Sequence, residues 1–329
     1  MIFVISVTFL GGSGTEGATK DSVINVKLAY STANDTQDQA GKLLKEKIEA
    51  ETNGKVKIQL FPAGQLGSNQ QLIQGVSNGT IEAVINPTAF LGGFAPLLTV
   101  ADLPFLWKDR ESVQNVLNDP EVSKPLFDSL APKGIKGMAF FEYGPKNFLT
   151  TIPLDRPNAL SKIKFRVMQA PVLIDQYKAW DCIAIPTAQG EVYTALQQKT
   201  IDGIENTPDY FYQNKFYEVA PYFTQSGHGH LVLIFMVNAK WFDSLPQDIQ
   251  QTFVNISKDI VPIVGKWGEV KDQQSLENMK RNANFTVKTL SVGQTDILRS
   301  KSQLVYDNFI KSNPGADSII KVIRKKLGS

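Results

Sequence analysis

The residue types that most often carry catalysis or bind metals are scarce in this sequence. The only histidines, His228 and His230, are one residue apart, so both rings would lie on one face of a strand, with no third strong metal ligand nearby. No G-x-S-x-G or P-loop motif occurs. Cys182, in WDCIAIP, is expected to pack as a small hydrophobic side chain. We therefore expect no enzyme, metal site or cofactor; an exported enzyme with His228 and Glu142 as its acid–base pair is the alternative.

Arg166 is the side chain whose type and position best suit ligand binding. It lies near the end of KIKFRVM, whose alternating residues predict a strand. In open α/β sheets, ligands bind at the carboxyl ends of the strands. A guanidinium stays ionised when it is desolvated and meets a carboxylate with two parallel hydrogen bonds. The alternative is an arginine exposed on a solvated face.

Three more polar residues lie at predicted strand ends. Asn206 ends the strand-like IDGIEN, where it could bind a ligand or shape the following turn. Glu142 and Lys146 flank the Gly-Pro pair that follows another predicted strand. Each signal is weak alone, but together they place polar groups at several strand exits.

The elements that must position these residues alternate between strand-like and helix-like patterns. Five successive segments show this alternation, at residues 23–30, 40–50, 55–61, 68–79 and 81–85. The pattern restarts with predicted strands at 136–142 and 162–168 and a helix at 171–180. This order predicts an α/β fold with a largely parallel sheet.

Two later segments are strongly apolar. Residues 230–238 (HLVLIFMVN) are nearly all apolar, which predicts a strand buried on both faces. After Pro246, apolar residues recur every three or four positions from Ile249 to Val270. This spacing predicts a long helix with a kink at Pro262, long enough to lie across more than one domain.

Composition excludes several classes of protein. Of the 329 residues, 34 are basic and 32 acidic, for a net charge of +2, whereas nucleic-acid readers usually carry a clear basic excess. The 42% hydrophobic share supports a sizeable core in one large domain or two ordinary ones. One cysteine allows no internal disulfide framework. No apolar run approaches the roughly 20 residues that span a bilayer, so a soluble mature protein is expected.

Residues 1–20 are predicted to be a signal peptide or its remnant. Residues 2–10 form a short apolar run followed by small residues, as in such leaders, although no basic residue precedes the run. Gly12, Gly14 and Gly17 match the dinucleotide-binding G-x-G-x-x-G, but a strand-like segment follows where a helix is needed to hold a pyrophosphate. The sequence therefore favours export over cofactor binding.

Five stretches together resemble a known family. They are FPAGQLGSNQQLIQGVSNGTIEAV, ADLPFLW, KIKFRVM, GEVYTALQQKTIDGIENTPDYF and HGHLVLIFMVNAKWFDSLP. In this order and spacing they resemble the periplasmic solute-binding subunit of tripartite ATP-independent periplasmic (TRAP) transporters, the DctP type. The resemblance covers roughly residues 24–325. It implies a two-lobed α/β periplasmic binding protein fold, with hinge strands and a long bridging helix.

The resemblance also implies an organisation and partners. Lobe I would comprise residues 21–143 plus 232–271, and lobe II residues 144–231 plus 272–329. A small organic acid would be held between the lobes and delivered to membrane permease subunits by a monomeric periplasmic receptor. A binding protein for an ABC importer is the alternative.

Family ligand contacts fall on particular residues of this chain. The arginine that pairs with the ligand carboxylate falls on Arg166, and the asparagine of D-G-x-E-N falls on Asn206. A third contact, often arginine, falls on Lys146, which would offer a point charge instead of a fork. The position before GEVYTAL, often aromatic, is Gln189, which makes the expected pocket more polar.

The remaining candidates complete a polar pocket. They are Asn34 in STANDTQ, which also contains Asp35 and Gln37, together with Asn86, Glu142 and Asp209. One arginine, one lysine and several amides favour a hydroxylated monocarboxylate, such as a uronate or an aldonate. A dicarboxylate or an α-keto acid is the alternative ligand.

Overall fold

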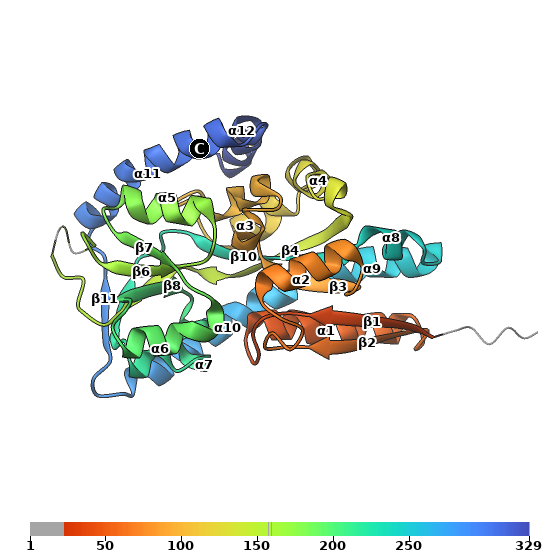
Figure 1. Ribbon diagram of the computed structural model, residues 1–329, viewed down its shortest axis with the longest axis horizontal. Coiled ribbons are helices and arrows are strands. Elements are labelled where there is room, and N and C mark those ends of the chain that lie inside the picture. Colours follow the sequence, from red (N-terminus) through yellow and green to blue (C-terminus); the bar gives the residue numbers. More distant parts are fainter. Residues whose placement is uncertain (1–22, 157, 159, 329) are drawn as a thin grey trace, which may run out of the picture.

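Two β-sheets with helices packed around them form the computed structural model, which describes residues 23–156, 158 and 160–328 (Figure 1). Within these residues, the first sheet has the strand order β2-β1-β3-β10-β4 and the second has the order β11-β9-β5-β8-β6-β7. The predicted leader at residues 1–20, which includes Gly12, Gly14 and Gly17, lies outside the described residues.

Among the described residues, five strands form the first sheet and six form the second. The first sheet contains β1 (Ile24–Ala29), β2 (Val56–Phe61), β3 (Ala83–Pro87), β4 (Ile135–Pro145) and β10 (His230–Asn238). The second contains β5 (Asn147–Thr150), β6 (Lys164–Val167), β7 (Ile183–Pro186), β8 (Gly203–Asn206), β9 (Tyr222–Gln225) and β11 (Thr286–Thr289). Every residue of β10 is buried, as its apolar sequence predicts.

The prediction of a largely parallel sheet is correct for only part of each sheet. Strand β1 is parallel to β2 and β3, and β6 is parallel to β7 and β8. In contrast, β10 is antiparallel to β3 and β4, and β5 is antiparallel to β8 and β9. The change from parallel to antiparallel pairing involves strands at which the chain crosses between the sheets. One such crossing is at Lys146, where β4 continues directly into β5.

Twelve α-helices occur in the described residues. They are α1 (Thr36–Glu51), α2 (Asn69–Asn78), α3 (Arg110–Leu117), α4 (Pro120–Asp128), α5 (Pro171–Ala179), α6 (Val192–Gln197), α7 (Pro208–Gln213), α8 (Ala239–Asp243), α9 (Gln247–Asp259), α10 (Val261–Lys280), α11 (Val292–Ser312) and α12 (Ala316–Leu327). None of them combines the length and apolar character that crossing a membrane would need.

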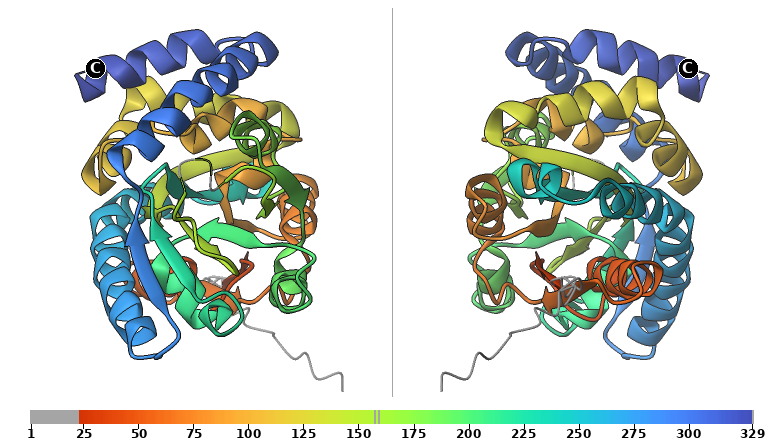
Figure 2. Two further views of the ribbon diagram at one scale, coloured as in Figure 1. Left: turned by 90° about the vertical axis from the view of Figure 1, so that its left-hand side faces the viewer. Right: turned by 90° about the vertical axis from the view of Figure 1, so that its right-hand side faces the viewer.

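Helix α10 joins the two halves of the molecule, the first built around the sheet that contains β1 and β10 and the second around the sheet that contains β5 and β6. It packs against α7 beside the second sheet and against β4 and α1 of the first. Gly268 permits this close approach, because a Cβ atom there would lie 3.1 Å from the Tyr143 carbonyl oxygen. The chain also returns to the first half at its end, where α12 packs on α3 and α4 (Figure 2).

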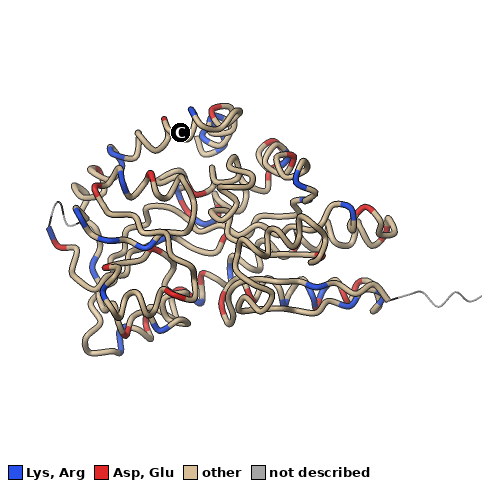
Figure 3. The backbone as a smooth tube through the Cα atoms, viewed as in Figure 1, with Lys and Arg blue, Asp and Glu red and all other residues tan. Residues whose placement is uncertain are grey.

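The single kinked helix predicted after Pro246 is two helices. Helix α9 ends at Asp259 and α10 begins at Val261, which puts Pro262 in the first turn, where its missing N–H is not needed. The predicted apolar stripe does not continue through α10, because Ile263 and Val270 are exposed. The buried face of α10 instead combines Val261, Val264 and Met279 with small and polar residues. Acidic and basic residues are interspersed over both halves (Figure 3).

Candidate functional site

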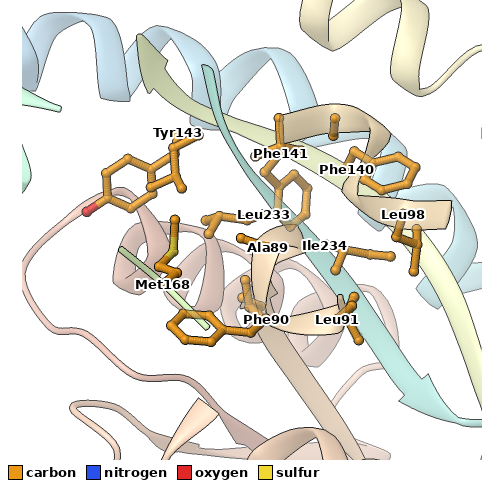
Figure 4. Close-up of a cluster of buried hydrophobic side chains, with 14 of the residues drawn as sticks. Ala89, Phe90, Leu91, Leu98, Phe140, Phe141, Tyr143, Met168, Leu233 and Ile234 are labelled. Carbon is orange, nitrogen blue, oxygen red and sulfur yellow. The ribbon is translucent and has the colours of Figure 1, made fainter. Parts of the chain in front are cut away.

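A cavity lies between the two sheets, and both contribute to its wall. Its lining residues are Ser31, Thr32, Gln37, Asn69, Pro87, Phe90, Tyr143, Leu231 and Leu233 from the first half, and Arg166, Met168, Gln189, Asn206 and Tyr210 from the second. Phe90, Tyr143, Met168 and Leu233 are among the buried side chains labelled in Figure 4. A separate apolar groove beside α11 is lined by none of the eight site residues predicted from the sequence.

The two walls are also joined directly. Next to Asn69 and Met168, the Gln70 Nε2 atom donates a hydrogen bond of 2.6 Å to Gln169 Oε1. This bond links the first turn of α2 to the segment after β6. The cavity is therefore walled by two halves that touch beside it.

Arg166 places a guanidinium in the cavity wall. It is 3% exposed on β6, so the reading of a solvent-exposed strand arginine is wrong. Its Nε atom donates to the Thr187 carbonyl at 3.1 Å, which fixes the orientation of the group. The Nη2 atom is buried and has no hydrogen-bond partner in the described structure. Leaving a buried charged donor unsatisfied is costly, so this atom is suited to receive an anionic ligand.

Asn206 and Gln189 line the same cavity beside Arg166. The Asn206 Oδ1 atom accepts the Thr207 backbone N–H at 2.9 Å, so the Nδ2 group is the part left to donate. The Tyr210 hydroxyl donates to Gln189 Oε1. The structure thus brings together three of the eight residues predicted for the site.

Lys146 lies outside the cavity lining, in a buried ionic network. Its Nζ atom is 3.3 Å from Asp102 Oδ1 and 3.4 Å from Glu205 Oε1, and the residue is 1% exposed. His228 Nε2 lies 2.8 Å from Glu205 Oε2, and the Tyr177 hydroxyl donates to the same oxygen at 2.9 Å. A direct contact between Lys146 and the ligand remains a prediction.

This network controls the charge of its members. Burial alone would raise the pKa of Glu205, but the Lys146 charge and the bonds from His228 and Tyr177 lower that pKa to about 2. Burial also lowers the pKa of His228, despite the neighbouring Glu205. The network therefore holds an ionised carboxylate immediately before Asn206 on β8.

Glu142 belongs to a second buried network at the crossing strands. It accepts from Arg110 Nη1 at 2.7 Å, and its other oxygen lies 2.9 Å from His230 Nδ1. The Arg110 guanidinium also bonds to Asp272 of α10. His228 and Glu142 therefore do not form the acid–base pair of the alternative reading. Among the described residues, no three His, Cys, Asp or Glu side chains gather to hold a metal ion.

The other three predicted residues occupy different positions. Asp209 is fully buried on α7, where Oδ1 accepts from Ser275 Oγ at 2.9 Å and Oδ2 is unpartnered. Asn34 is exposed, with its backbone N–H bonded to Asp38. Asn86 is buried on β3 outside the cavity lining, and its Nδ2 donates to the Asn69 backbone carbonyl at 3.1 Å.

Sequence reasoning missed Asn69, Tyr143 and Tyr210 as lining residues. Asn69 lies near the start of the helix-like segment predicted at residues 68–79. Ser68 caps α2 through the Gln71 N–H, which leaves Asn69 in the first turn. Ser31 and Thr32 were detectable in principle, since they follow β1 at its carboxyl end. The two tyrosines carry no such local signal.

A buried acidic cluster accompanies the network at the crossing strands. Asp35 caps α1 and accepts the Tyr143 hydroxyl at 2.9 Å, and burial raises the pKa of Asp35 to about 6. Asp272 accepts the Asp209 backbone N–H at 3.0 Å, and burial raises the pKa of Asp272 to about 7 despite Arg110. These carboxyls hold protons more tightly in the folded chain than in the unfolded chain.

The raised pKa values of Asp35 and Asp272 are expected to make the ligand-free protein less stable at pH 8 than at pH 5, by about 1–3 kcal/mol after subtraction of the opposite contribution from His228, whose lowered pKa favours the folded state as pH rises. The folded state binds more protons between the ordinary carboxyl pKa of 3.8 and the raised values, so the free energy of unfolding falls as pH rises through that window. Glu205 acts only at lower pH, because its contribution is lost as pH falls toward 2.

Calorimetric unfolding at the two pH values measures this difference. Asp272→Asn is expected to reduce it, whereas Asp307→Asn, at an exposed position on α11, is expected to leave it unchanged. A pH difference that Asp272→Asn leaves unchanged would contradict the assignment.

Comparisons with known proteins agree with this architecture. The model for "Bacterial extracellular solute-binding protein, family 7" matches residues 29–313. The 2,3-diketo-L-gulonate-binding periplasmic protein YiaO of Escherichia coli is 27% identical over 317 residues, 96% of each chain.

Two solved structures are similar over nearly their whole length. The sugar acid binding protein DctPAm of Advenella mimigardefordensis, in complex with galactonate, has a TM-score of 0.86 at 28% identity and covers 93% of this chain and 99% of its own. A TRAP periplasmic solute-binding protein of Shewanella oneidensis, with bound succinate, has a TM-score of 0.86 at 27% identity and covers 92% and 99%. The two carry different acids on the same fold.

Proposed function

The chain belongs to family 7 of the bacterial extracellular solute-binding proteins, and from that membership we propose that it captures a sugar acid, such as a uronate or an aldonate, by its carboxylate. It has the two-lobed α/β fold of the periplasmic receptors of TRAP transporters, and its relatives are solute-binding receptors rather than enzymes. No catalytic step is assigned to any residue of this chain.

The observation that carries the proposal is the unpartnered Nη2 atom of Arg166 in the wall of the cavity. A ligand carboxylate is the group that this buried cation lacks. Asn206 Nδ2 supplies a second donor from the neighbouring strand β8. Burial of the ion pair is favourable when the other carboxylate lone pairs are also satisfied, which is the role we assign to Asn206 and Gln189.

Capture would proceed by closure of two lobes around the acid. We propose lobe I as residues 21–143 plus 232–271 and lobe II as 144–231 plus 272–329. The strands of the two sheets support this division, and the packing of α12 on α3 and α4 adds a strap from the second lobe to the first. A ligand that contacts both walls favours the closed form by its differential affinity.

The other predicted residues support this motion. Glu142 and Asp209, through Arg110 and α10, would hold the crossing elements, and Lys146 would hold the Glu205 segment beside Asn206. Asn86 would position Asn69. Asn34, which is exposed, remains a predicted contact.

Delivery requires membrane permease subunits, which we propose as the partners of this monomeric receptor. Genes for a large and a small TRAP permease subunit beside the gene for this chain would support that pairing. A neighbouring gene for an importer ATPase would instead support the ABC importer alternative.

A thermal-shift screen against organic acids tests the function. The protein is first unfolded and refolded to remove carried-over ligand. An acid at about 1,000 times its dissociation constant adds about 4 kcal/mol of stability, which is a shift of several degrees. Shifts with uronates or aldonates are expected; shifts only with dicarboxylates or keto acids would replace the ligand class, and no shift with any acid would contradict the receptor assignment.

A further inference from the structure

Gln37 is locked in one orientation inside the first-half wall of the cavity. Its Nε2 group donates to the Ile85 backbone carbonyl at 2.9 Å, and the residue is 1% exposed. A carbonyl oxygen can be met only by a donor, so the amide cannot be flipped. The Oε1 atom must therefore face the opposite direction, toward Ser31 and Thr32.

This orientation determines where two hydroxyl hydrogens point. Ser31 Oγ donates to Gln37 Oε1 at 3.2 Å, and Thr32 Oγ1 donates to the same oxygen at 2.6 Å. A hydroxyl has one hydrogen, so what Ser31 and Thr32 have left for a ligand is their lone pairs.

Two further groups give this wall the same character. Asn69 lines the cavity, and its buried Oδ1 atom has no hydrogen-bond partner in the described structure. Asp35 lies directly behind the wall, bonded to the backbone N–H of Gln37 and to the hydroxyl of Tyr143. The first-half wall therefore offers acceptors and is backed by a carboxyl group.

The opposite wall has the opposite character. Arg166 can only donate, and Asn206 has its oxygen committed to the Thr207 N–H. A ligand spanning the cavity thus meets donors at one end and acceptors at the other. A carboxylate fits the donor end, and a hydroxyl group, which can donate, fits the acceptor end.

We propose that Gln37 is a specificity-determining positioning residue, which turns the first-half wall into an acceptor surface and thereby selects acids with a hydroxyl group at the end distal to the carboxylate over dicarboxylates. The inference rests on the proposed function and specifies which chemical group the site selects at the end of the ligand distal to the carboxylate. A second carboxylate carries only acceptors, so it would meet the Ser31 and Thr32 oxygens and the Asn69 Oδ1 atom without a hydrogen to share.

Matched acids test the selectivity. Galactonate and galactarate share their hydroxylated carbons and differ at one end, which is a CH₂OH group in the first and a second carboxylate in the second; gluconate and glucarate form another such pair. Calorimetric titration of the refolded protein is expected to give at least tenfold tighter binding of the aldonate in the pair that binds. A ratio below tenfold, or a preference for the aldarate, would overturn the inference.

A variant tests the role of Gln37 itself. Gln37→Leu removes the shared acceptor and frees the Ser31 and Thr32 hydrogens to meet a carboxylate, so the aldonate-to-aldarate ratio should fall at least fivefold. Gln39→Leu, two residues along α1 and half-buried, is the matched control and should keep the ratio. If Gln37→Leu keeps the ratio within fivefold, the orienting role is wrong.

A second variant covers the case in which Gln37→Leu does not fold. Thr32→Val has nearly the same shape and removes one acceptor, so aldonate affinity and the ratio should both fall, whereas an unchanged ratio would count against the proposal. Different results would contradict the proposed function and the acceptor wall. If no acid binds, the proposed function fails; if aldonates and aldarates bind equally, only the acceptor wall fails.

Discussion

Arg166→Ala is expected to weaken binding of the carboxylate ligand by about 100-fold or more while the protein stays folded. The substitution removes the one buried cation of the cavity wall and leaves the ligand carboxylate desolvated without a charged partner. Calorimetric titration of the acid found in the screen measures the change. Arg166→Lys should recover part of the loss, because lysine restores the charge without the planar fork.

Arg156→Ala is the matched control, since Arg156 is exposed in the second half of the molecule. The Arg156→Ala variant should bind the acid with the same affinity as the unsubstituted protein. A loss of less than fivefold in Arg166→Ala would show that the carboxylate binds elsewhere. Unfolding temperatures of both variants without ligand separate this result from a loss of fold.

Lys146→Met is expected to lower the free energy of unfolding by about 3–5 kcal/mol, the usual cost of breaking a buried ion pair from one side. The ammonium lies between Asp102 and Glu205, and both carboxylates would be left without this cation. Thermal or urea-induced unfolding of the ligand-free protein measures the loss.

Lys124→Met is the control for that experiment. Lys124 forms an exposed pair with Asp128 on α4, and such pairs contribute about 0.5 kcal/mol or less. A loss in Lys146→Met no larger than in this control would show that the network is not what stabilises the crossing between the sheets. Adding Glu205→Gln to Lys146→Met should recover part of the stability, since one uncompensated charge is removed.

Local patterns predicted much of the fold. The helix-like segment predicted at residues 68–79 is α2, which is bounded by a capping box at Ser68 and by the left-handed Gly79, since caps act within one turn. The apolar run of β10 became a strand buried along its whole length. The direction of β10 and β5 was not predictable in this way, since strand direction depends on which distant segments pair.

The candidate site, too, was predictable where local patterns carry the information and not where distant contacts decide. Arg166 and Asn206 were identified because strand-end position and family motif agree on them. Lys146 and Glu142 were also placed near the site, but their partners, Asp102 and Arg110, are far apart from them in the chain. Only the folded chain shows that those charges are already neutralised.

The acceptor wall, formed by Ser31, Thr32 and Asn69 around Gln37, was the feature least predictable from the sequence. Gln37 stood out only as one polar residue of STANDTQ, and its meaning comes from a bond to Ile85, 48 positions away. Hydrogen-bond direction depends on that contact rather than on the residue type. Such information is not contained in a local sequence pattern.

Calorimetric titration of the refolded protein with galactonate and with galactitol tests the central claim most directly. The two molecules carry the same chain of hydroxyl groups and differ in whether one end is a carboxylate. Capture by Arg166 predicts that galactonate, or gluconate in the parallel pair with glucitol, binds at least 100-fold more tightly than the neutral polyol. Equal binding of the acid and the polyol would contradict a receptor that recognises its ligand by the carboxylate.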